Sequence, residues 1–308
     1  MSDPADSKAI AFIGLGVMGG PMTGHLARTG QNAGHRVTAY NRSPERARKW
    51  AQLWADEGLE VAFADTPREA ASGADIVMVC VGNDEDLASV TLADNGVLAS
   101  MREGSLLIDH TTTSADMARQ LGEACAAKGI AFVDAPVSGG QAGAENGQLA
   151  IMCGGSDEAM ARATPAMQPY AKAITHVGPT GAGQTAKMVN QMCIAGILGG
   201  LSEAIRLAQG AGLDLEKTYQ AIAGGAAQSW QMDNRWASMT ADTFDFGFAI
   251  DWMRKDLGYA LGEANRLGLS SPITALVDQF YADVQANGGA RHDTSALITR
   301  LPKAPNSK

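Results

Sequence analysis

The stretch AFIGLGVMGGPM, residues 11–22, decides the fold expected for this chain. It starts as a short apolar strand and continues into the pattern G-x-G-x-x-G at Gly14, Gly16 and Gly19. Where this pattern joins a strand to a helix, the first glycine forms the tight turn, and the second lets the backbone approach a pyrophosphate. The third glycine lets the helix pack closely on the strand.

The pattern therefore predicts a dinucleotide-binding loop. The phosphates would bind at the N-terminus of the following helix, where free N–H groups and the helix dipole favour anions. A glycine-rich turn that holds no ligand is the alternative. The predicted cofactor-binding loop consists of Gly14, Leu15, Gly16, Val17, Met18 and Gly19.

Strand-like and helical segments alternate after this loop. A helix is expected at residues 43–58, with Ser43 as N-cap and Pro44 at the first helical position. Thr66 and Glu69 have the spacing of a capping box. Further strands are expected at residues 36–42, 60–65, 75–82, 105–110 and 130–136. This alternation predicts an α/β fold, a Rossmann-type doubly wound parallel sheet with helices on both faces.

The pattern changes near residue 178, after which helical periodicity replaces strand signals. A long helix is expected from about Gly183, and further helices at residues 213–225, 248–268 and 272–288. We therefore expect a dinucleotide-binding Rossmann domain at residues 8–178. An all-helical C-terminal domain for substrate binding and dimerisation is expected at residues 179–308.

Composition excludes several classes of partner and site. The 308 residues carry a formal net charge of -9, which argues against nucleic-acid binding. No apolar run reaches the ~18 residues of a spanning helix, and the polar start MSDPADSK is neither a signal nor a transit peptide. The cysteines and histidines lack metal-site spacing, so we expect no metal site. Cys80 and Cys153 lie inside apolar strand-like runs, so we expect buried thiols there and a reducing, cytoplasmic location.

The end of the second strand bears on the choice of cofactor. A dinucleotide fold reads the adenosine ribose there, and an acid favours NAD whereas an arginine accommodates the phosphate of NADP. This strand ends in Asn41, Arg42 and Ser43, with no acid. NADP is therefore the expected cofactor. NAD is the alternative, if the lengthened connection TGQNAGHRV, residues 29–37, leaves Arg42 in solvent.

Three further motifs follow the glycine loop in a fixed order. They are DAPVSGGQAGAENGQL at residues 134–149, GAGQTAKMVNQ at residues 181–191 and RKDLGYA at residues 254–260. With the loop, they make nearly the whole chain resemble the β-hydroxyacid dehydrogenases of the 3-hydroxyisobutyrate dehydrogenase and tartronate-semialdehyde reductase type. The resemblance implies an active site between the two domains.

The resemblance also implies roles for matching residues. Lys187 matches the catalytic lysine, and Asn190 matches an asparagine that helps to hold the substrate. Ser138, Gly139 and Gly140 match the segment that binds the substrate carboxylate. Thr112 and Lys255 match residues that contact the cofactor.

Two departures from the family pattern lie near the expected nicotinamide site. Val81 and Gly82 stand where many members have Leu-Pro, and His110 stands where many have a small hydroxyl residue. Val81 and Gly82 are counted among the cofactor-binding residues. The departures leave open which 3-hydroxy acid is the substrate.

Without the family, Lys187 already has the features of an acid/base group. It is the one charged residue between Lys172 and Glu203. The helix dipole and apolar neighbours both disfavour a cation there, so we expect a lowered pKa. Asn190 and Gln191, three and four residues later, share its helix face and offer amides to a hydroxyl or carboxylate. The alternatives are a lysine whose ammonium reaches water, and His110 as the acid/base.

The segment Ser138-Gly139-Gly140 follows a strand, where open α/β sheets bind ligands. Its glycines expose backbone N–H groups that suit an anion, although an ordinary tight turn is the alternative. Together with the family resemblance, which implies the substrate class, the sequence predicts hydride transfer between NADP(H) and a short 3-hydroxy acid or semialdehyde, with Lys187 exchanging the proton. The other readings are an imine reductase, a phosphogluconate-type dehydrogenase or a non-enzymatic dinucleotide-binding protein. We expect a homodimer or homotetramer that binds a small carboxylate, without nucleic-acid or membrane partners.

Overall fold

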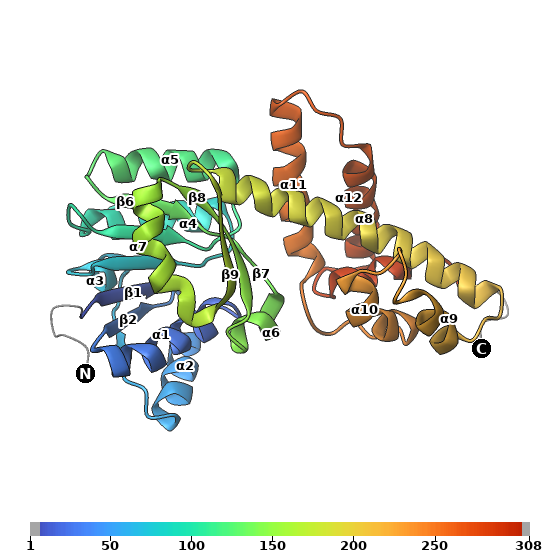
Figure 1. Cartoon of the computed structure of the whole chain (residues 1–308), viewed down its shortest axis with the longest axis horizontal. Coiled ribbons are helices and arrows are strands. Elements are labelled where there is room, and N and C mark those ends of the chain that lie inside the picture. The colour runs from blue at the N-terminus through green and yellow to red at the C-terminus, as the bar shows by residue number, and fades with distance from the viewer. Residues whose placement is uncertain (1–6, 304–308) are drawn as a thin grey trace. The chain divides into compact units, whose positions relative to one another are not determined.

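The computed structural model describes residues 7–303. The first six residues, on which the expectation of no signal sequence rests, and the last five lie outside the described residues. The chain forms two compact units, Met1–Lys187 and Met188–Lys308. Helix α8, Ala182–Gly210, begins in the first unit and continues into the second (Figure 1).

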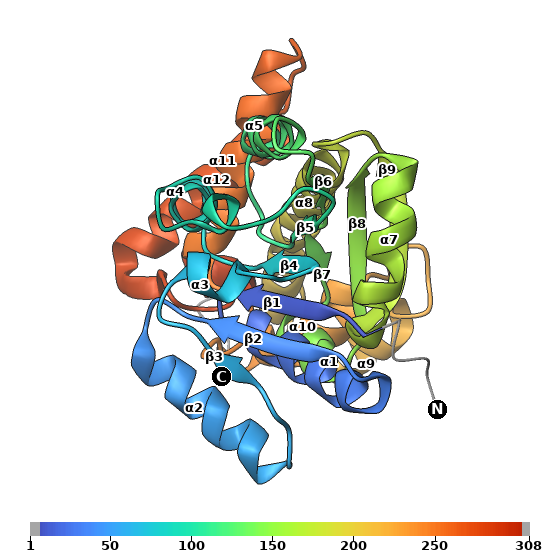
Figure 2. The same ribbon diagram turned by 90° about the vertical axis from the view of Figure 1, so that its left-hand side faces the viewer.

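Within the described residues, the first unit is built on one nine-stranded sheet in the order β3-β2-β1-β4-β5-β6-β8-β7, with β9 beside β8 (Figure 2). Strands β1 to β6 are parallel, and the order reverses between β1 and β4, where doubly wound sheets bind ligands. The strands are β1 (Ala9–Ile13), β2 (Arg36–Tyr40), β3 (Ala62–Phe63), β4 (Ile76–Val79), β5 (Leu106–Asp109), β6 (Ala131–Asp134), β7 (Val137–Ser138), β8 (Leu149–Gly155) and β9 (Ala171–Gly178).

Helices cover both faces of this sheet, so the predicted Rossmann-type fold is confirmed (Figure 2). One apolar core joins Phe12 of β1 to Met22 and Met160 of the helices on one face. A second core joins Val79 to Leu121 on the opposite face. The first face carries α1 (Gly19–Ala33), α2 (Pro44–Asp56) and α7 (Asp157–Met167); the second carries α3 (Pro67–Ala71), α4 (Asp84–Thr91) and α5 (Ala115–Ala126).

The predicted helix starts are confirmed by their caps. Ser43 Oγ accepts the backbone N–H of Arg46 at 3.4 Å, with Pro44 at the first helical position of α2. At α3, Thr66 Oγ1 accepts the N–H of Glu69 at 3.1 Å. The carboxylate of Glu69 reaches back to the N–H of Asp65, one residue earlier than in a standard capping box.

Strands β7, β8 and β9 were not predicted as part of the sheet. Strand β8 runs antiparallel to β6 and β7, and β9 runs parallel to β8. Strand β9, with the sequence AKAITHVG, is mostly exposed and contains Lys172 and His176, so it lacks a buried apolar run. Cys153 on β8 is buried as expected, whereas Cys80 is only half-buried, which corrects the expectation for that thiol.

The second unit is helical, as predicted. Its core gathers Leu198, Trp236, Met253 and Tyr281 from four different helices. Helix α10 was not predicted, although its buried residues Met232, Trp236 and Met239 have helical spacing. The helices after α8 are α9 (Leu215–Ile222), α10 (Trp230–Thr240), α11 (Ile250–Arg266) and α12 (Pro272–Val284), followed by a π-helical segment at Gln285–Gly289 and a 3₁₀ helix at Thr294–Arg300.

Helix α8 is also long and apolar enough to cross a membrane by composition, with a mean hydropathy of 1.3 over 18 residues. The expectation counted uninterrupted apolar runs, and the run in this helix is bounded by Asn190 and Gln191 on one side and by Ser202 and Glu203 on the other. The mean hydropathy is an average over 18 residues and tolerates such polar residues. Core helices of soluble proteins pass the same test, so this property alone is weak support for a membrane span.

Candidate active site

The glycine loop has the geometry that a dinucleotide requires. Gly14 has φ +100°, and a Cβ there would lie 2.2 Å from the carbonyl oxygen of Cys80. A Cβ on Gly19 would lie 1.9 Å from the oxygen of Gly14, so the start of α1 packs directly on the loop. A Cβ on Gly16 would meet nothing within 4 Å, which leaves open space beside the backbone. The residues therefore fit a pyrophosphate at the N-terminus of α1, whose first turn carries no acid.

Side chains from β2 and α2 hold this loop in place. The backbone N–H of Leu15 donates to Asn41 Oδ1 at 2.9 Å, and Trp50 Nε1 donates to the carbonyl oxygen of Leu15 at 3.0 Å. Leu15 is fully buried, whereas Val17 is exposed and Met18 half-buried. Asn41 therefore positions the loop as well as marking the end of β2.

The three residues at the end of β2 have different surroundings. Asn41 Nδ2 donates to the backbone oxygen of Ser43 at 2.9 Å, and Ser43 caps α2. Arg42 keeps 79% of its side chain exposed, and its Nη1 lies 2.6 Å from Oδ1 of Asp86. The guanidinium of Arg42 is thus exposed to a ligand, although it is already paired with the carboxylate of Asp86 on α4.

The ends of β4 and β5 meet beside the glycine loop. The backbone N–H of Val81 donates to Thr111 Oγ1 at 3.1 Å, and a Cβ on Gly14 would lie 3.1 Å from Val81 Cγ1. Gly82 and Thr112 follow these strands and are both half-buried. The first unit therefore brings together the predicted cofactor residues of β1, β2, β4 and β5.

His110 is a core residue in this structure. It is 1% exposed, its Nδ1 lies 2.7 Å from the carbonyl oxygen of Ala135, and its Nε2 lies 2.8 Å from the hydroxyl of Tyr170. A carbonyl only accepts, so Nδ1 carries the proton and Nε2 accepts from the tyrosine. Burial lowers the pKa of His110 to about 4 and keeps it neutral. Its two nitrogens are engaged, so the structure gives no support to His110 as the acid/base.

The segment after β7 exposes backbone to solvent. Ser138 is half-buried, whereas Gly139 and Gly140 are exposed, with φ of +134° and +63°. A Cβ on Gly140 would meet nothing within 4 Å. This leaves room for a ligand against the backbone N–H groups that begin the short helix α6 (Gly140–Glu145).

A buried carboxylate fixes the start of α8. Asp134, at the end of β6, accepts the backbone N–H of Gly181 at 2.7 Å and that of Gln184 at 2.9 Å. Burial raises the pKa of Asp134 to about 6, although these two N–H groups oppose the rise. A Cβ on Gly183 would lie 2.5 Å from the Asp134 carbonyl oxygen, so the helix start packs directly on the strand.

Gln184 adds a second link between α8 and the sheet. Its Oε1 accepts the N–H of Thr113 at 3.0 Å, and its Nε2 donates to the oxygen of Thr111 at 2.6 Å. Lys187, 7% exposed, lies one turn further along this anchored helix. The helix start therefore gives the lysine a fixed position in the first unit.

The second unit begins with the two predicted amides. Asn190 Nδ2 donates to Gln191 Oε1 at 2.8 Å, and Gln191 Nε2 donates to Asp256 Oδ2 at 2.7 Å. Lys255, the predicted cofactor contact on α11, lies with its ammonium 3.1 Å from Asp256 Oδ1. Asp134, Gln184 and Asp256 were not among the predicted site residues. Asp134 and Gln184 lay inside quoted motifs, and Asp256 follows the predicted Lys255.

The chain also resembles known proteins along nearly its whole length. A family model described as the NAD-binding domain of 6-phosphogluconate dehydrogenase matches residues 9–178. One described as NAD-binding of NADP-dependent 3-hydroxyisobutyrate dehydrogenase matches residues 181–301.

Curated relatives and solved structures agree with these models. The chain is 34% identical to 3-hydroxyisobutyrate dehydrogenase of Pseudomonas aeruginosa, over 92% of this chain and 94% of that protein. It is 34% identical to 2-hydroxy-3-oxopropionate reductase of Escherichia coli, over 97% and 99% of the two chains. The structure of Mycobacterium tuberculosis 3-hydroxyisobutyrate dehydrogenase with L-serine has a TM-score of 0.84 at 33% identity, covering 95% and 98%.

The chain belongs to the β-hydroxyacid dehydrogenase family. It is an NAD(P)-dependent hydroxyacid dehydrogenase. In the first unit of this dehydrogenase, the open space beside the backbone of Gly16 agrees with a bound dinucleotide.

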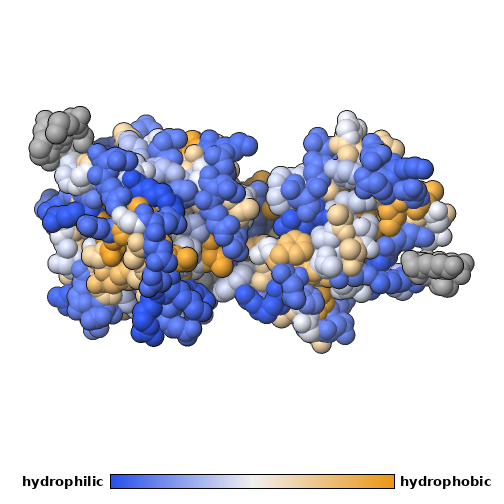
Figure 3. Space-filling model, turned by 90° about the horizontal axis from the view of Figure 1, so that it is seen from below, coloured by the Kyte–Doolittle hydropathy of each residue, from blue (hydrophilic) through white to orange (hydrophobic). Residues whose placement is uncertain are grey.

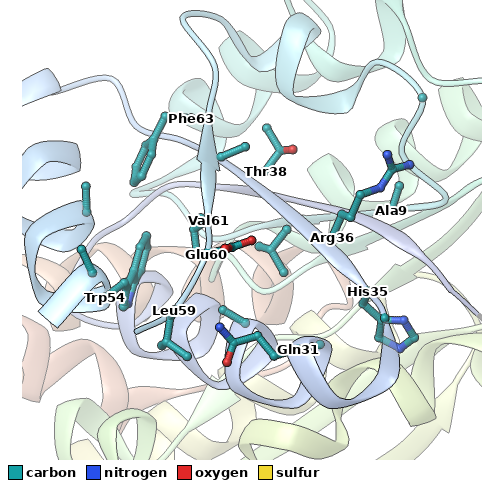
Figure 4. A pocket seen from close by; sticks show the side chains of 18 of the residues that line it. Ala9, Gln31, His35, Arg36, Thr38, Trp54, Leu59, Glu60, Val61 and Phe63 are labelled. Carbon is teal, nitrogen blue, oxygen red and sulfur yellow. The ribbon is translucent and has the colours of Figure 1, made fainter. Parts of the chain in front are cut away.

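The dehydrogenase also has a groove of about 1090 Å³ that is separate from the glycine loop. Its apolar lining includes Trp54, Leu59 and Phe63, and its polar lining includes Arg36 and Glu60 (Figure 4). The groove lies along the first residues of β1 and β2, whereas the glycine loop follows the carboxyl end of β1. It is therefore not part of the candidate cofactor site.

Proposed function

We propose that this dehydrogenase transfers a hydride between NADP(H) and a short 3-hydroxy acid or its semialdehyde, with Lys187 as the general acid/base. The observation that carries the proposal is the placement of Lys187. It is buried near the start of α8, where Asp134 and Gln184 anchor the helix, and Asn190 follows one turn later. A nearly buried lysine beside an amide is suited to hold and move a proton.

The nicotinamide supplies or accepts the hydride when it is bound. In the reductive direction, Lys187 donates a proton to the oxygen on the carbon that is reduced. In the oxidative direction, it removes the hydroxyl proton. Asn190, which is half-buried, orients this same oxygen through its side-chain amide.

Ser138 and the N–H groups of Gly139 and Gly140 are proposed to bind the substrate carboxylate. The positive φ angles of both glycines and the open space at Gly140 support this role. Anion binding by backbone N–H groups recognises the carboxylate and leaves the rest of the substrate unspecified. Both relatives named above act, by their names, on small hydroxy or oxo acids, which agrees with this assignment.

NADP is proposed as the preferred cofactor. The end of β2 presents no acid to the ribose, and Arg42 is mostly exposed. The ion pair with Asp86 holds the guanidinium near the end of β2 but also partly offsets its charge. The family model over residues 181–301 is described as that of an NADP-dependent enzyme, which supports the same choice.

A homodimer or homotetramer in the cytoplasm is also proposed. Apolar side chains remain exposed along α8 and α12, among them Ile197, Leu207 and Ile273, at 40%, 74% and 62%. Figure 3 shows such apolar surface among the hydrophilic residues of the helical unit. Burying it against a second copy removes apolar area from water. The buried thiols of Cys125 and Cys153 agree with a reducing compartment.

Absorbance at 340 nm tests the proposed activity. Purified protein is assayed with NADPH and NADH against a panel of semialdehydes, imines and 3-hydroxy acids, and its mass is measured by light scattering. Turnover of a semialdehyde or 3-hydroxy acid supports the proposal. Turnover of imines alone, or cofactor binding without turnover of any substrate, contradicts it.

A further inference from the structure

Three side chains of the helical unit form a directed chain of hydrogen bonds. Asp256 Oδ2 accepts from Gln191 Nε2 at 2.7 Å, and Gln191 Oε1 accepts from Asn190 Nδ2 at 2.8 Å. Asp256 and Gln191 are 2% and 1% exposed, whereas Asn190 is half-buried. A buried carboxylate on α11 is thus linked, through the buried amide of Gln191, to the amide of a half-buried asparagine on α8.

The carboxylate gives this chain its direction. An ionised carboxylate only accepts hydrogen bonds, so Gln191 has to face Asp256 with its NH₂ group. Its carbonyl oxygen then faces Asn190, which has to donate. The two ends of an amide are nearly equal in shape, so a neutral partner would not distinguish them in this way. Asp256 therefore determines the orientation of both amides.

Lys255 compensates the buried charge of Asp256. Its ammonium lies 3.1 Å from Oδ1, in an ion pair whose geometry is not that of a hydrogen bond. The ammonium also lies 5.1 Å from the ring centroid of Tyr259 and 5.8 Å from that of Trp252. A paired carboxylate remains an acceptor, which the direction of the chain requires.

We propose that Asp256 is a positioning residue of this dehydrogenase, which acts through Gln191 to fix the side-chain amide of Asn190. With one N–H committed to Gln191, Asn190 keeps its carbonyl oxygen and its second N–H in constant directions. This inference rests on the proposed function, in which Asn190 orients the reacting oxygen. A turned amide would present a donor where an acceptor is needed. Gln191 itself then acts on the substrate only through Asn190.

Exchanging the carboxylate of Asp256 and the amide of Gln191 tests the direction of these hydrogen bonds. Asp256→Asn removes the obligate acceptor, and Gln191→Glu places two carboxylates face to face. Each single variant is expected to lower kcat about tenfold to a hundredfold, the cost of a misplaced group, with little change in the KM for NADPH. In the double variant, the carboxylate introduced at position 191 accepts from Asn190 and from the amide introduced at position 256. Asn190 then donates its hydrogen bond as in the wild type, so the kcat of the double variant should be at least about tenfold higher than that of each single variant.

A matched control lies on the same helix. Asp251 also accepts from a glutamine amide, that of Gln285, at 2.5 Å, and it lies outside the proposed chain. Asp251→Asn should retain wild-type kcat. The thermal midpoint of every variant is measured, and kcat is expressed per folded protein. The inference is overturned if the double variant is no more active than the single variants, or if Asp256→Asn retains wild-type kcat.

A spectroscopic readout separates this inference from the proposed function. With ¹⁵N-labelled asparagine, the Asn190 side-chain amide is assigned by its loss in Asn190→Ala. Its hydrogen-bonded proton should keep its chemical shift in the double variant and change it in Asp256→Asn. If the wild type turns over no substrate in the panel, the proposed function fails, but this measurement still tests the hydrogen bonds from Asp256 through Gln191 to Asn190. Equal spectra of wild type and Asp256→Asn would overturn the inference.

Discussion

Asp134 accepts the backbone N–H of Gly181 at 2.7 Å and so joins the end of β6 to the start of α8. Each of the two residues opens a sequence motif, one leading to Ser138 and the other to Lys187. The start of the helix that carries the proposed acid/base group is therefore anchored to the strand that leads to the proposed carboxylate-binding segment. This contact explains physically why two motifs 47 residues apart belong together.

Lys187→Ala is expected to lower kcat by about 10²–10⁴ with folding intact, the usual cost of losing a general acid/base. The physical reason is that the variant lacks the group that, in the proposed function, exchanges a proton with the reacting oxygen. Steady-state rates at saturating NADPH measure the loss. Lys172→Ala, which removes an exposed lysine of β9, is the control and should retain full activity. Near-wild-type turnover in a folded Lys187→Ala protein would contradict the assignment.

Ser138→Ala is expected to raise the KM for carboxylate substrates more than it lowers kcat. Ser138 and the adjacent N–H groups are proposed to bind the carboxylate equally in the ground and transition states, and uniform binding of this kind appears in KM. Full kinetics on the free acid and on its methyl ester check this. The role is rejected if the wild type uses the ester as well as the acid.

Much of the fold could be predicted, because buried parallel strands are apolar throughout and helix caps have clear sequence signals. Strand β9 could not, since Lys172 and His176 give it an exposed, mixed face. The site was harder to predict where contacts are distant in sequence. The bond between Gln191 and Asp256 spans 65 residues, and no local pattern indicates it. The same holds for His110, whose partner Tyr170 lies on a later turn.

Burial of Asp109 predicts how stability depends on pH. Asp109 is fully buried, its Oδ2 has no hydrogen-bond partner among the described residues, and burial raises its pKa from 3.8 to about 7. A raised pKa means that the folded state holds the proton more tightly than the unfolded state. The stability contributed by this proton is complete below about pH 4 and is lost as the pH rises to about 7.

Asp109→Asn should remove this loss, because the amide is neutral at every pH and can still accept the N–H of Thr111. The variant's free energy of unfolding, relative to wild type, should therefore increase between pH 4 and pH 7, by at most about 4 kcal/mol, and then level off. Urea titrations at a series of pH values measure this difference. A constant difference between the two proteins across that range would show that Asp109 does not titrate as stated.

The last prediction concerns the cofactor. Arg42 can form charge-assisted hydrogen bonds to the 2′-phosphate of NADP, each worth roughly 1.5–3 kcal/mol or about one to two powers of ten in Kd. Because the Asp86 carboxylate, 2.6 Å away, offsets part of that charge, we expect a preference for NADPH of at least about tenfold rather than the full range. Comparing kcat/KM for NADPH and NADH measures it.

Variants at the end of β2 and on α4 then test which side chains cause the preference for NADPH. Arg42→Ala should weaken NADPH much more than NADH, and Asp86→Asn should strengthen NADPH because it removes the competing carboxylate. Asn41→Asp should penalise NADPH by charge repulsion, while its carboxylate can still accept the N–H of Leu15 and so hold the glycine loop. Arg28→Ala removes an arginine of another exposed ion pair, with Glu57, and should change neither cofactor. Equal use of both cofactors by the wild type, or a preference for NADH, would mean that Arg42 remains with Asp86 and does not read the phosphate.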